Sequence, residues 1–321
     1  FEDEISDWIW YAEAYPSELR NINGGDISAI HEKLKLLAQV LDENFDSISH
    51  DTKLWYDAIP QKPQDWAKEK IMEMKKASLI PEEFNGYRIV HISDLHNKQF
   101  GKNQERLLKR IRAVSPDIIV ITGDLIDRRK YDLETAMLFI NGAIKIAPLY
   151  YVSGNHEAWS GDYANISERL RSSGVQILDD TKATMIRGKG KIDILGLSDP
   201  DFLTYSYLEG TNTSKLREHL ERLSDDAVFQ ILLCHRPELF EIYARENIDL
   251  IFSGHAHGGQ VRIPFVGAIV APDQGFFPKY SSGAYTQNQS TMIVSRGLGN
   301  SIIPIRIFNR PEIVVVTLRS E

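Results

Sequence analysis

The 321-residue sequence has a single cysteine, Cys234, so it cannot form an internal disulfide, and that residue is expected to be a small buried hydrophobe. It has no run of about 18 apolar residues, so nothing in this chain is expected to span a bilayer. Basic residues do not outnumber acidic ones. The net charge at pH 7 is −8, which argues against nucleic acid as a partner because phosphate-backbone binding needs clustered Lys and Arg.

The composition, 42% hydrophobic and 26% charged, is that of a globular protein with one large domain or two smaller ones. Residues 1–80 differ from the rest, with 16 acidic and 9 basic residues and four of the five tryptophans. Helices are expected over 3–14, 28–47 and 64–77. This predicts a small acidic, Trp-rich helical unit over 1–80 and a main domain over 81–321. The unit either packs on that domain or offers a surface to a partner or to membrane headgroups.

From residue 84 onward, apolar runs alternate with amphipathic stretches, which predicts an α/β fold. Buried strands are expected at 88–93, 117–122, 148–153, 176–178, 184–187, 191–197, 228–234 and 248–252. Helices are expected near 103–114, 132–146, 165–173, 214–224 and 237–246. The last part, with strand-like stretches at 260–270, 292–295 and 312–318, is expected to be antiparallel or mixed β structure.

Polar residues that can bind metals follow five of these strands. In parallel sheets ligands collect at the carboxyl ends of the strands, so these residues are expected on one rim. Each group alone has a simpler explanation, such as a helix cap, a turn or a surface His. Five such groups together indicate a metal site, and its candidate ligands are Asp94, His96, Asp124, Asn155, His235, His255 and His257.

Seven candidate ligands exceed the four of a structural zinc site, and there is no second Cys for a thiolate site. Carboxylate, amide and imidazole ligands in this number suit two divalent transition metal ions, Mn, Fe or Zn. Such a pair lowers the pKa of a bridging water and holds two oxygens of a phosphoryl group. Phosphate-ester hydrolysis is therefore the expected reaction, with diester and monoester substrates both compatible.

In order and in type, these five groups of residues resemble those of the calcineurin-like metallophosphoesterases. The stretches 254–264, 274–280 and 295–301 most resemble the bacterial YkuE-type branch of that family. The matching motifs are Asp94-x-His96, Gly123-Asp124-x-x-Asp127-Arg128, Gly154-Asn155-His156-Glu157, His235 and Gly254-His255-x-His257. The resemblance implies two mixed β-sheets sandwiched between helices. It also implies a metal-dependent phosphohydrolase acting on a small-molecule phosphate ester through a metal-bridging hydroxide.

The resemblance also implies the role of each residue. Asp94, His96, Asp124 and His257 would hold one metal, and Asp124, Asn155, His235 and His255 the other, with Asp124 as the bridge. His156 would assist the leaving group, with Asp127 orienting its ring. Because it follows a ligand directly, His156 should lie on the rim without binding metal, and a carboxylate partner would favour its cationic form.

Substrate contacts are predicted less sharply. Arg128 is expected either to contact phosphate oxygens or to be solvated. Arg236, next to His235, lies near the site or merely begins a helix at Pro237. The remaining candidates for the cleft are Gly259, Phe276, Lys279 and Arg296, with core or lid packing as the alternative for the phenylalanine.

Related sequences usually reach the first strand through a membrane anchor and a β segment, whereas helical sequence is expected here. The chain begins at Phe1 rather than Met, which leaves open an upstream signal or anchor. Localisation is therefore undecided between the bacterial cytoplasm and a membrane-associated place in the envelope. The alternative function is a non-catalytic metal-binding scaffold that docks a partner through residues 1–80.

Overall fold

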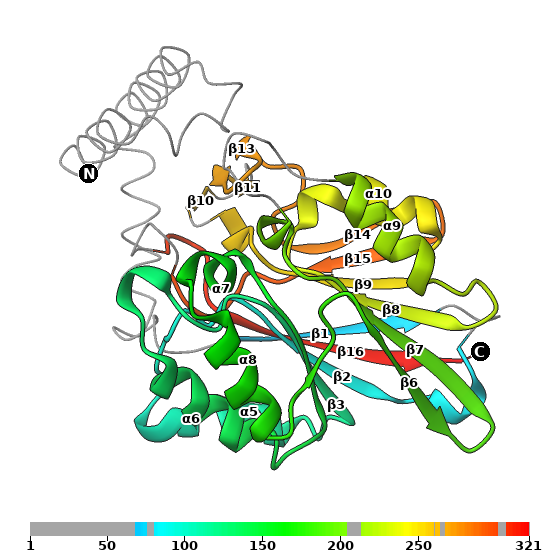
Figure 1. Cartoon of the computed structure of the whole chain (residues 1–321), viewed down its shortest axis with the longest axis horizontal. Coiled ribbons are helices and arrows are strands. Elements are labelled where there is room, and N and C mark those ends of the chain that lie inside the picture. The colour runs from blue at the N-terminus through cyan, green and yellow to red at the C-terminus, as the bar shows by residue number, and fades with distance from the viewer. Residues whose placement is uncertain are drawn as a thin grey trace.

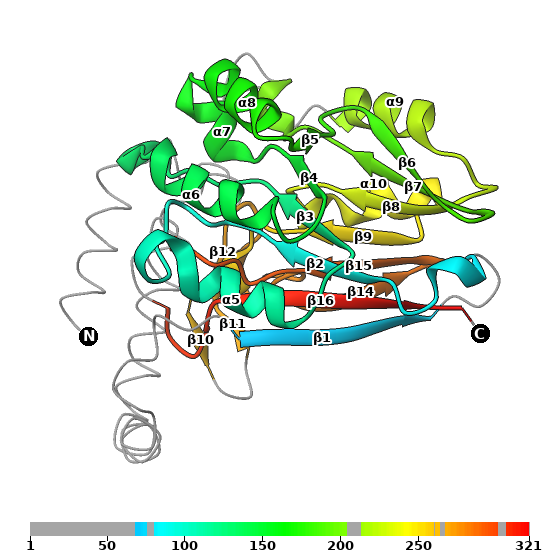
Figure 2. The same ribbon diagram turned by 90° about the horizontal axis from the view of Figure 1, so that it is seen from below.

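The computed structural model describes residues 68–75, 80–203, 213–259, 261–263, 267–300 and 306–320. Two six-stranded sheets form the centre of the described chain, and helices cover their outer faces (Figures 1 and 2). The predicted α/β sandwich is confirmed. The helices predicted over 3–14 and 28–47 lie outside the described residues.

The first sheet is largely parallel. Strands β2 to β5 run parallel, while β16 is antiparallel to β2 and pairs in parallel with β1. In spatial order the strands are β1 (Lys68–Lys75), β16 (Glu312–Arg319), β2 (Arg88–Ile92), β3 (Ile118–Thr122), β4 (Leu149–Val152) and β5 (Gln176–Ile177).

The second sheet has a parallel centre and antiparallel edges. Strands β7, β8, β9 and β15 are parallel, and β6 and β14 are each joined antiparallel to a neighbour. The order is β14 (Gly283–Gln287), β15 (Ser290–Val294), β9 (Leu250–Ser253), β8 (Phe229–Leu233), β7 (Gly190–Gly196) and β6 (Lys182–Arg187). Two short antiparallel pairs follow β9, β10 (Arg262–Ile263) with β11 (Gly267–Ala268) and β12 (Val270–Ala271) with β13 (Gly275–Phe276).

The helices lie on the two outer faces. Helices α5 (Glu105–Ala113), α6 (Leu133–Ala143) and α8 (Tyr163–Ser172) pack on the first sheet, and α9 (Thr213–Leu223) and α10 (Phe240–Tyr243) pack on the second. The short α7 (Asn155–Ser160) begins directly after β4. None of the helices in the described part of the chain combines the length and apolar character that crossing a bilayer requires.

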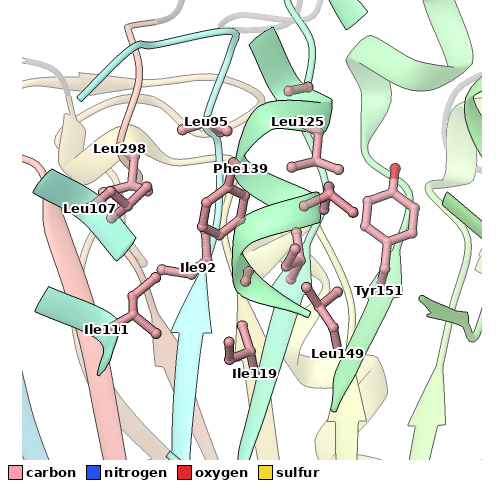
Figure 3. Packing of buried hydrophobic residues seen from close by; sticks show 14 of the residues in the cluster. Ile92, Leu95, Leu107, Ile111, Ile119, Leu125, Phe139, Leu149, Tyr151 and Leu298 are labelled. Carbon is pink, nitrogen blue, oxygen red and sulfur yellow. The ribbon is translucent and has the colours of Figure 1, made fainter. Parts of the chain in front are cut away.

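Three apolar layers hold these elements together. Residues of α5 and α6, such as Leu107 and Phe139, pack against one face of the first sheet, where Ile92 and Ile119 point outward (Figure 3). The opposite face packs against the second sheet, and the outer face of the second sheet packs against α9 and α10. Strands buried on both faces explain the continuous apolar runs in the sequence.

The prediction of a helix over 64–77 is wrong for the residues of this range that the structure describes. Lys68–Lys75 forms the eight-residue strand β1, which pairs in register with β16. This strand places part of the proposed 1–80 unit in the first sheet, so the chain does approach β2 through a β segment. The separate character of residues 1–67 stays a prediction. The expected change to β structure after residue 260 is confirmed within the described residues, and the hairpin strand β14 was missed.

Candidate metal centre

The loops after β2, β3, β4, β8 and β9 meet at one place. Two groups of side chains there have ligand atoms that all lie within 4.8 Å of one another, and Asp124 belongs to both. The first group is Asp94, His96, Asp124 and His257, and the second comprises Asp124, His235 and His255. All six are buried.

In the first group, two imidazoles and two carboxylates converge. The Nε2 atoms of His96 and His257 lie 3.2 Å apart. His96 Nε2 is 3.4 Å from Asp124 Oδ2, and His257 Nε2 is 3.4 Å from Asp94 Oδ1. Burial lowers the pKa of His96 to about 3 and lowers that of His257, so both rings are neutral and have lone pairs to donate.

The second group is built around His235. Its Nε2 lies 2.9 Å from Asn155 Oδ1, 3.1 Å from His255 Nδ1 and 3.3 Å from Asp124 Oδ2. Asn155, the seventh predicted ligand, therefore joins this group. Burial alone would lower the pKa of His235, but the neighbouring Asp124 outweighs it and raises the pKa to about 10, so a metal ion would have to displace a proton there. Imidazole nitrogens and carboxylate or amide oxygens aimed at a common point are the donors that divalent transition metals bind, so the residues present fit two such ions.

The backbone at these residues is unusual. Asp94, His96, Asp124, His255 and His257 all have positive φ, between 44° and 62°. Non-glycine residues rarely adopt this region, although Asp, Asn and His do so more readily than most. A tight turn at each strand end thus directs the side chains inward, and close packing around Gly154 and Gly254 leaves no room there for a Cβ atom.

Glu157 ties two of the loops together. Its Oε2 accepts hydrogen bonds from the backbone N–H groups of Asp124 and Gly154, both at 2.8 Å, and its Oε1 accepts one from Ile126 at 3.2 Å. Burial and the nearby Asp124 raise the pKa of Glu157 to about 8. Glu157 belongs to the Gly154-Asn155-His156-Glu157 motif, but the sequence analysis assigned it no role. Its place three residues after Gly154, in a strand-to-helix turn, is the signal that indicates a capping role.

His156 lies beside the first group without joining it, and its ring packs edge-on against His96 with centroids 4.4 Å apart. Its Nδ1 accepts a hydrogen bond from the backbone N–H of Arg128 at 3.2 Å, whereas Asp127 Oδ1 lies 3.6 Å away. The carboxylate of Asp127 accepts hydrogen bonds from Arg129 and not from His156. The donors are the backbone N–H, Nε and Nη2 of Arg129, at 2.9 to 3.1 Å.

The nearby carboxylates favour the cationic form of His156, as expected, but they are not the largest influence on its charge. Burial lowers the pKa of His156, and this outweighs the opposing effect of Asp124 and Asp127. The ring is therefore neutral near pH 7 rather than cationic. With Nδ1 accepting from the backbone, the ring proton is on Nε2.

Arg236 is a buried hub beside the second group. It pairs with Asp199 at 2.7 Å and Asp201 at 2.7 Å, and also with Asp273, whose Oδ2 lies 2.8 Å from His255 Nε2. Both alternatives for Arg236 hold, because it is near the site and also precedes the short 3₁₀ helix Pro237–Leu239. Asp273 was missed, since its position in a polar turn gives no sign of a remote contact. Cys234 is buried, as predicted.

The candidate substrate residues lie in different surroundings. Arg128 is exposed and stacks on Trp159, 4.5 Å from the ring centroid, next to His156. Lys279 directs its charge to the exposed Glu241 at 3.2 Å, and Arg296 Nε lies 3.7 Å from Glu312. Phe276 is half-buried in β13. Gly259 has φ 74°, and an added Cβ would lie 2.3 Å from that of Ala268, so backbone packing alone requires this glycine.

A four-layer α/β sandwich with two buried, carboxylate-sharing ligand groups at its strand ends defines a metallophosphoesterase type of protein. The sequence model of the calcineurin-like phosphoesterases matches residues 87–259. The uncharacterized metallophosphoesterase YkuE of Bacillus subtilis is 33% identical over 76% of this chain and 83% of its own length. The chain therefore belongs to the calcineurin-like phosphoesterase family, as its motifs suggested.

Two further likenesses are to proteins whose names state an activity. Phosphodiesterase YaeI of Escherichia coli is 26% identical over 72% of this chain and 82% of its own. Among solved structures, a dimetal phosphatase from Danio rerio aligns over 67% of this chain and 88% of its own, with 14% identity and a TM-score of 0.40.

Proposed function

We propose that the protein is a hydrolase of phosphate esters that depends on two divalent transition metal ions, Mn, Fe or Zn. The observation that carries the proposal is the pair of buried ligand groups sharing Asp124. Asp94, His96, Asp124 and His257 would hold one ion. Asp124, Asn155, His235 and His255 would hold the other.

Bound ions would lower the pKa of a water and neutralise charge on the phosphoryl group. The chain itself supplies rigid support for this chemistry. Glu157 fixes the loops that carry Asp124 and Asn155, and the buried position of the ligands excludes bulk water, which strengthens electrostatic interactions within the site.

His156 is proposed to assist the leaving group. Its Nδ1 is occupied by the backbone N–H of Arg128, so the Nε2–H is the group that can donate to a departing oxygen. Asp127, held by Arg129, would favour a positive charge on the ring as a nearby anion rather than through a direct hydrogen bond. Arg128, stacked on Trp159, is the best placed of the candidate substrate contacts.

Phosphodiesters and phosphomonoesters both fit this arrangement, and the likeness to the phosphodiesterase YaeI favours testing diesters first. The deciding experiment uses chelator-treated full-length protein with Mn²⁺, Zn²⁺, Fe²⁺ or Mg²⁺ added back. Hydrolysis of bis(p-nitrophenyl) phosphate is compared with that of p-nitrophenyl phosphate. Metal-dependent turnover supports the hydrolase, and the ratio of the two rates gives the substrate class. Absence of turnover with every metal, despite bound ions, would favour the scaffold function instead.

The scaffold alternative concerns residues 1–80. Because β1 pairs with β16, a deletion that tests it should end at residue 67 and keep Lys68–Lys75. Unchanged turnover with altered localisation would identify the front of the chain as a docking element.

A further inference from the structure

The two imidazoles of the second ligand group, those of His235 and His255, have different hydrogen-bond partners on the side that faces away from the group. Each ring turns one nitrogen toward the group and the other away from it. The outward Nδ1 of His235 donates to the backbone carbonyl of Thr122 at 2.7 Å. The outward Nε2 of His255 lies 2.8 Å from a carboxylate oxygen, Asp273 Oδ2. A ring nitrogen that donates outward leaves the other nitrogen with its lone pair, and this is how proteins orient metal-binding histidines.

The proton on His255 is placed by two neighbours of opposite kind. Arg236 Nη1 lies 3.3 Å from the same Nε2 and can only donate, whereas Asp273 lies closer and can only accept when ionised. The shorter contact requires a proton on Nε2, since an unprotonated nitrogen and a carboxylate oxygen would repel each other at 2.8 Å. The lone pair of His255 is then on Nδ1, the atom that lies 3.1 Å from His235 Nε2.

Asp273 is itself held in place. The guanidinium of Arg236 forms an ion pair with the same Oδ2 atom, and this contact favours the ionised carboxylate. Arg236 is fixed in turn by Asp199, with bonds at 2.7 and 3.0 Å, and by Asp201 at 2.7 Å. Because Arg236 follows His235 in the chain, the hub connects both histidines of the second group.

The backbone at Asp273 determines which substitution can test its side chain. Its φ is 54°, in the left-handed region, at the turn that joins β12 to β13. Asp adopts this region more readily than most residues, and a glycine would adopt it without strain. Asp273, His255 and Glu238 also form a third group of ligand types within 4.8 Å, but Arg236 already supplies the positive charge there.

We propose that Asp273 is a positioning residue, which keeps His255 Nδ1 directed at the second metal position and so sets the affinity of that position alone. The proposal rests on the proposed metal-dependent function. Outer carboxylate partners of this kind typically contribute about 10–100-fold to metal affinity.

The test measures metal binding as well as turnover. Chelator-treated full-length protein is titrated with Co²⁺, and visible absorption and bound stoichiometry report the two positions separately. In Asp273→Gly, which fits the backbone conformation but lacks the carboxylate, one of the two ions should bind roughly 10–100-fold more weakly while the other is unchanged. Asp273→Asn keeps an acceptor oxygen without the charge, so its loss should be intermediate.

The matched control is Asp201→Asn, which removes a carboxylate from the same hub without touching His255. The affinities of this variant for both ions should remain within about twofold of those of the wild type. This change is well below the roughly 10–100-fold loss expected when an outer partner is removed. The proposal is overturned if Asp273→Gly leaves both affinities unchanged, or if it weakens both equally together with a lower melting temperature in chelator. Wild-type protein that binds no metal would instead refute the proposed function, on which this inference depends.

Discussion

The two halves of the candidate centre are built in different ways. The first half has two carboxylates, from Asp94 and the shared Asp124, whereas the second has only Asp124 and an amide. The outward ring nitrogens show the opposite difference, because those of the second half have the better hydrogen-bond partners. His235 and His255 both have acceptors for their outward nitrogens, while among the described residues His96 Nδ1 has no hydrogen-bond partner and His257 Nδ1 faces Arg306 at 3.5 Å. Metal binding in the first half therefore depends mainly on carboxylate charge, and in the second half mainly on the orientation of the histidine rings.

Substitution of a ligand that both groups share should therefore have a different effect on metal binding from substitution of a ligand that belongs to one group. Removing charge from the first half should affect one ion through lost attraction. Loosening the second half should affect the other ion through lost orientation. Only Asp124 should affect both.

The largest effect is expected for Asp124→Ala. Both ligand groups lose their common carboxylate, so both ions should be lost and turnover should fall by at least about 10³-fold, since the ions supply several kcal/mol of stabilisation. Metal content and kcat measured on the same sample check this. Retention of one tightly bound ion would show that Asp124 is not shared.

His156→Ala should separate chemistry from metal binding. The ring contacts His96 but is not part of either group, so both ions should remain while kcat falls by about 10²–10⁴-fold, the usual contribution of a general acid. Loss of metal in this variant would contradict the assigned roles. A substrate with a good leaving group should be affected less than one with a poor leaving group.

Asp94→Asn should weaken the first position selectively. The substitution removes a carboxylate that only the first group contains, so that affinity should fall more than the roughly 10–100-fold expected for an outer partner. The Co²⁺ titration described above checks it, with Asp273→Gly as the counterpart for the second half. Equal weakening of both positions in Asp94→Asn would remove the distinction between the two halves.

The smallest effect on the ligands themselves is expected for Glu157→Gln. Its two carboxyl oxygens accept from three buried N–H groups, and the NH₂ group of an amide would face at least one of these donors. Stability should fall by about 1–3 kcal/mol, measured by urea unfolding in the presence of chelator. The exposed Glu134→Gln is the control and should leave the unfolding midpoint unchanged.

Sequence reasoning worked where local pattern decides structure. Most strands of the two sheets, β1 and β14 excepted, and six of the proposed ligand side chains follow from apolar runs that end in polar residues, because the carboxyl ends of parallel strands share a rim. It failed where a distant partner decides. Lys68–Lys75 is rich in helix-forming Lys, Glu and Met, yet pairing with β16 makes it a strand. Asp273 reaches His255 across 18 residues, which no local pattern reveals.

The left-handed backbone at the ligand residues links the site to the folding of the whole chain. Five of the proposed ligands have positive φ, and each such residue costs of the order of 1 kcal/mol, a sizeable part of the 5–15 kcal/mol that holds a typical domain folded. Ions that bind only the native arrangement would offset this cost by mass action. Folding and metal loading would then be one coupled equilibrium, and metal supply in the cell would determine how much of the protein persists.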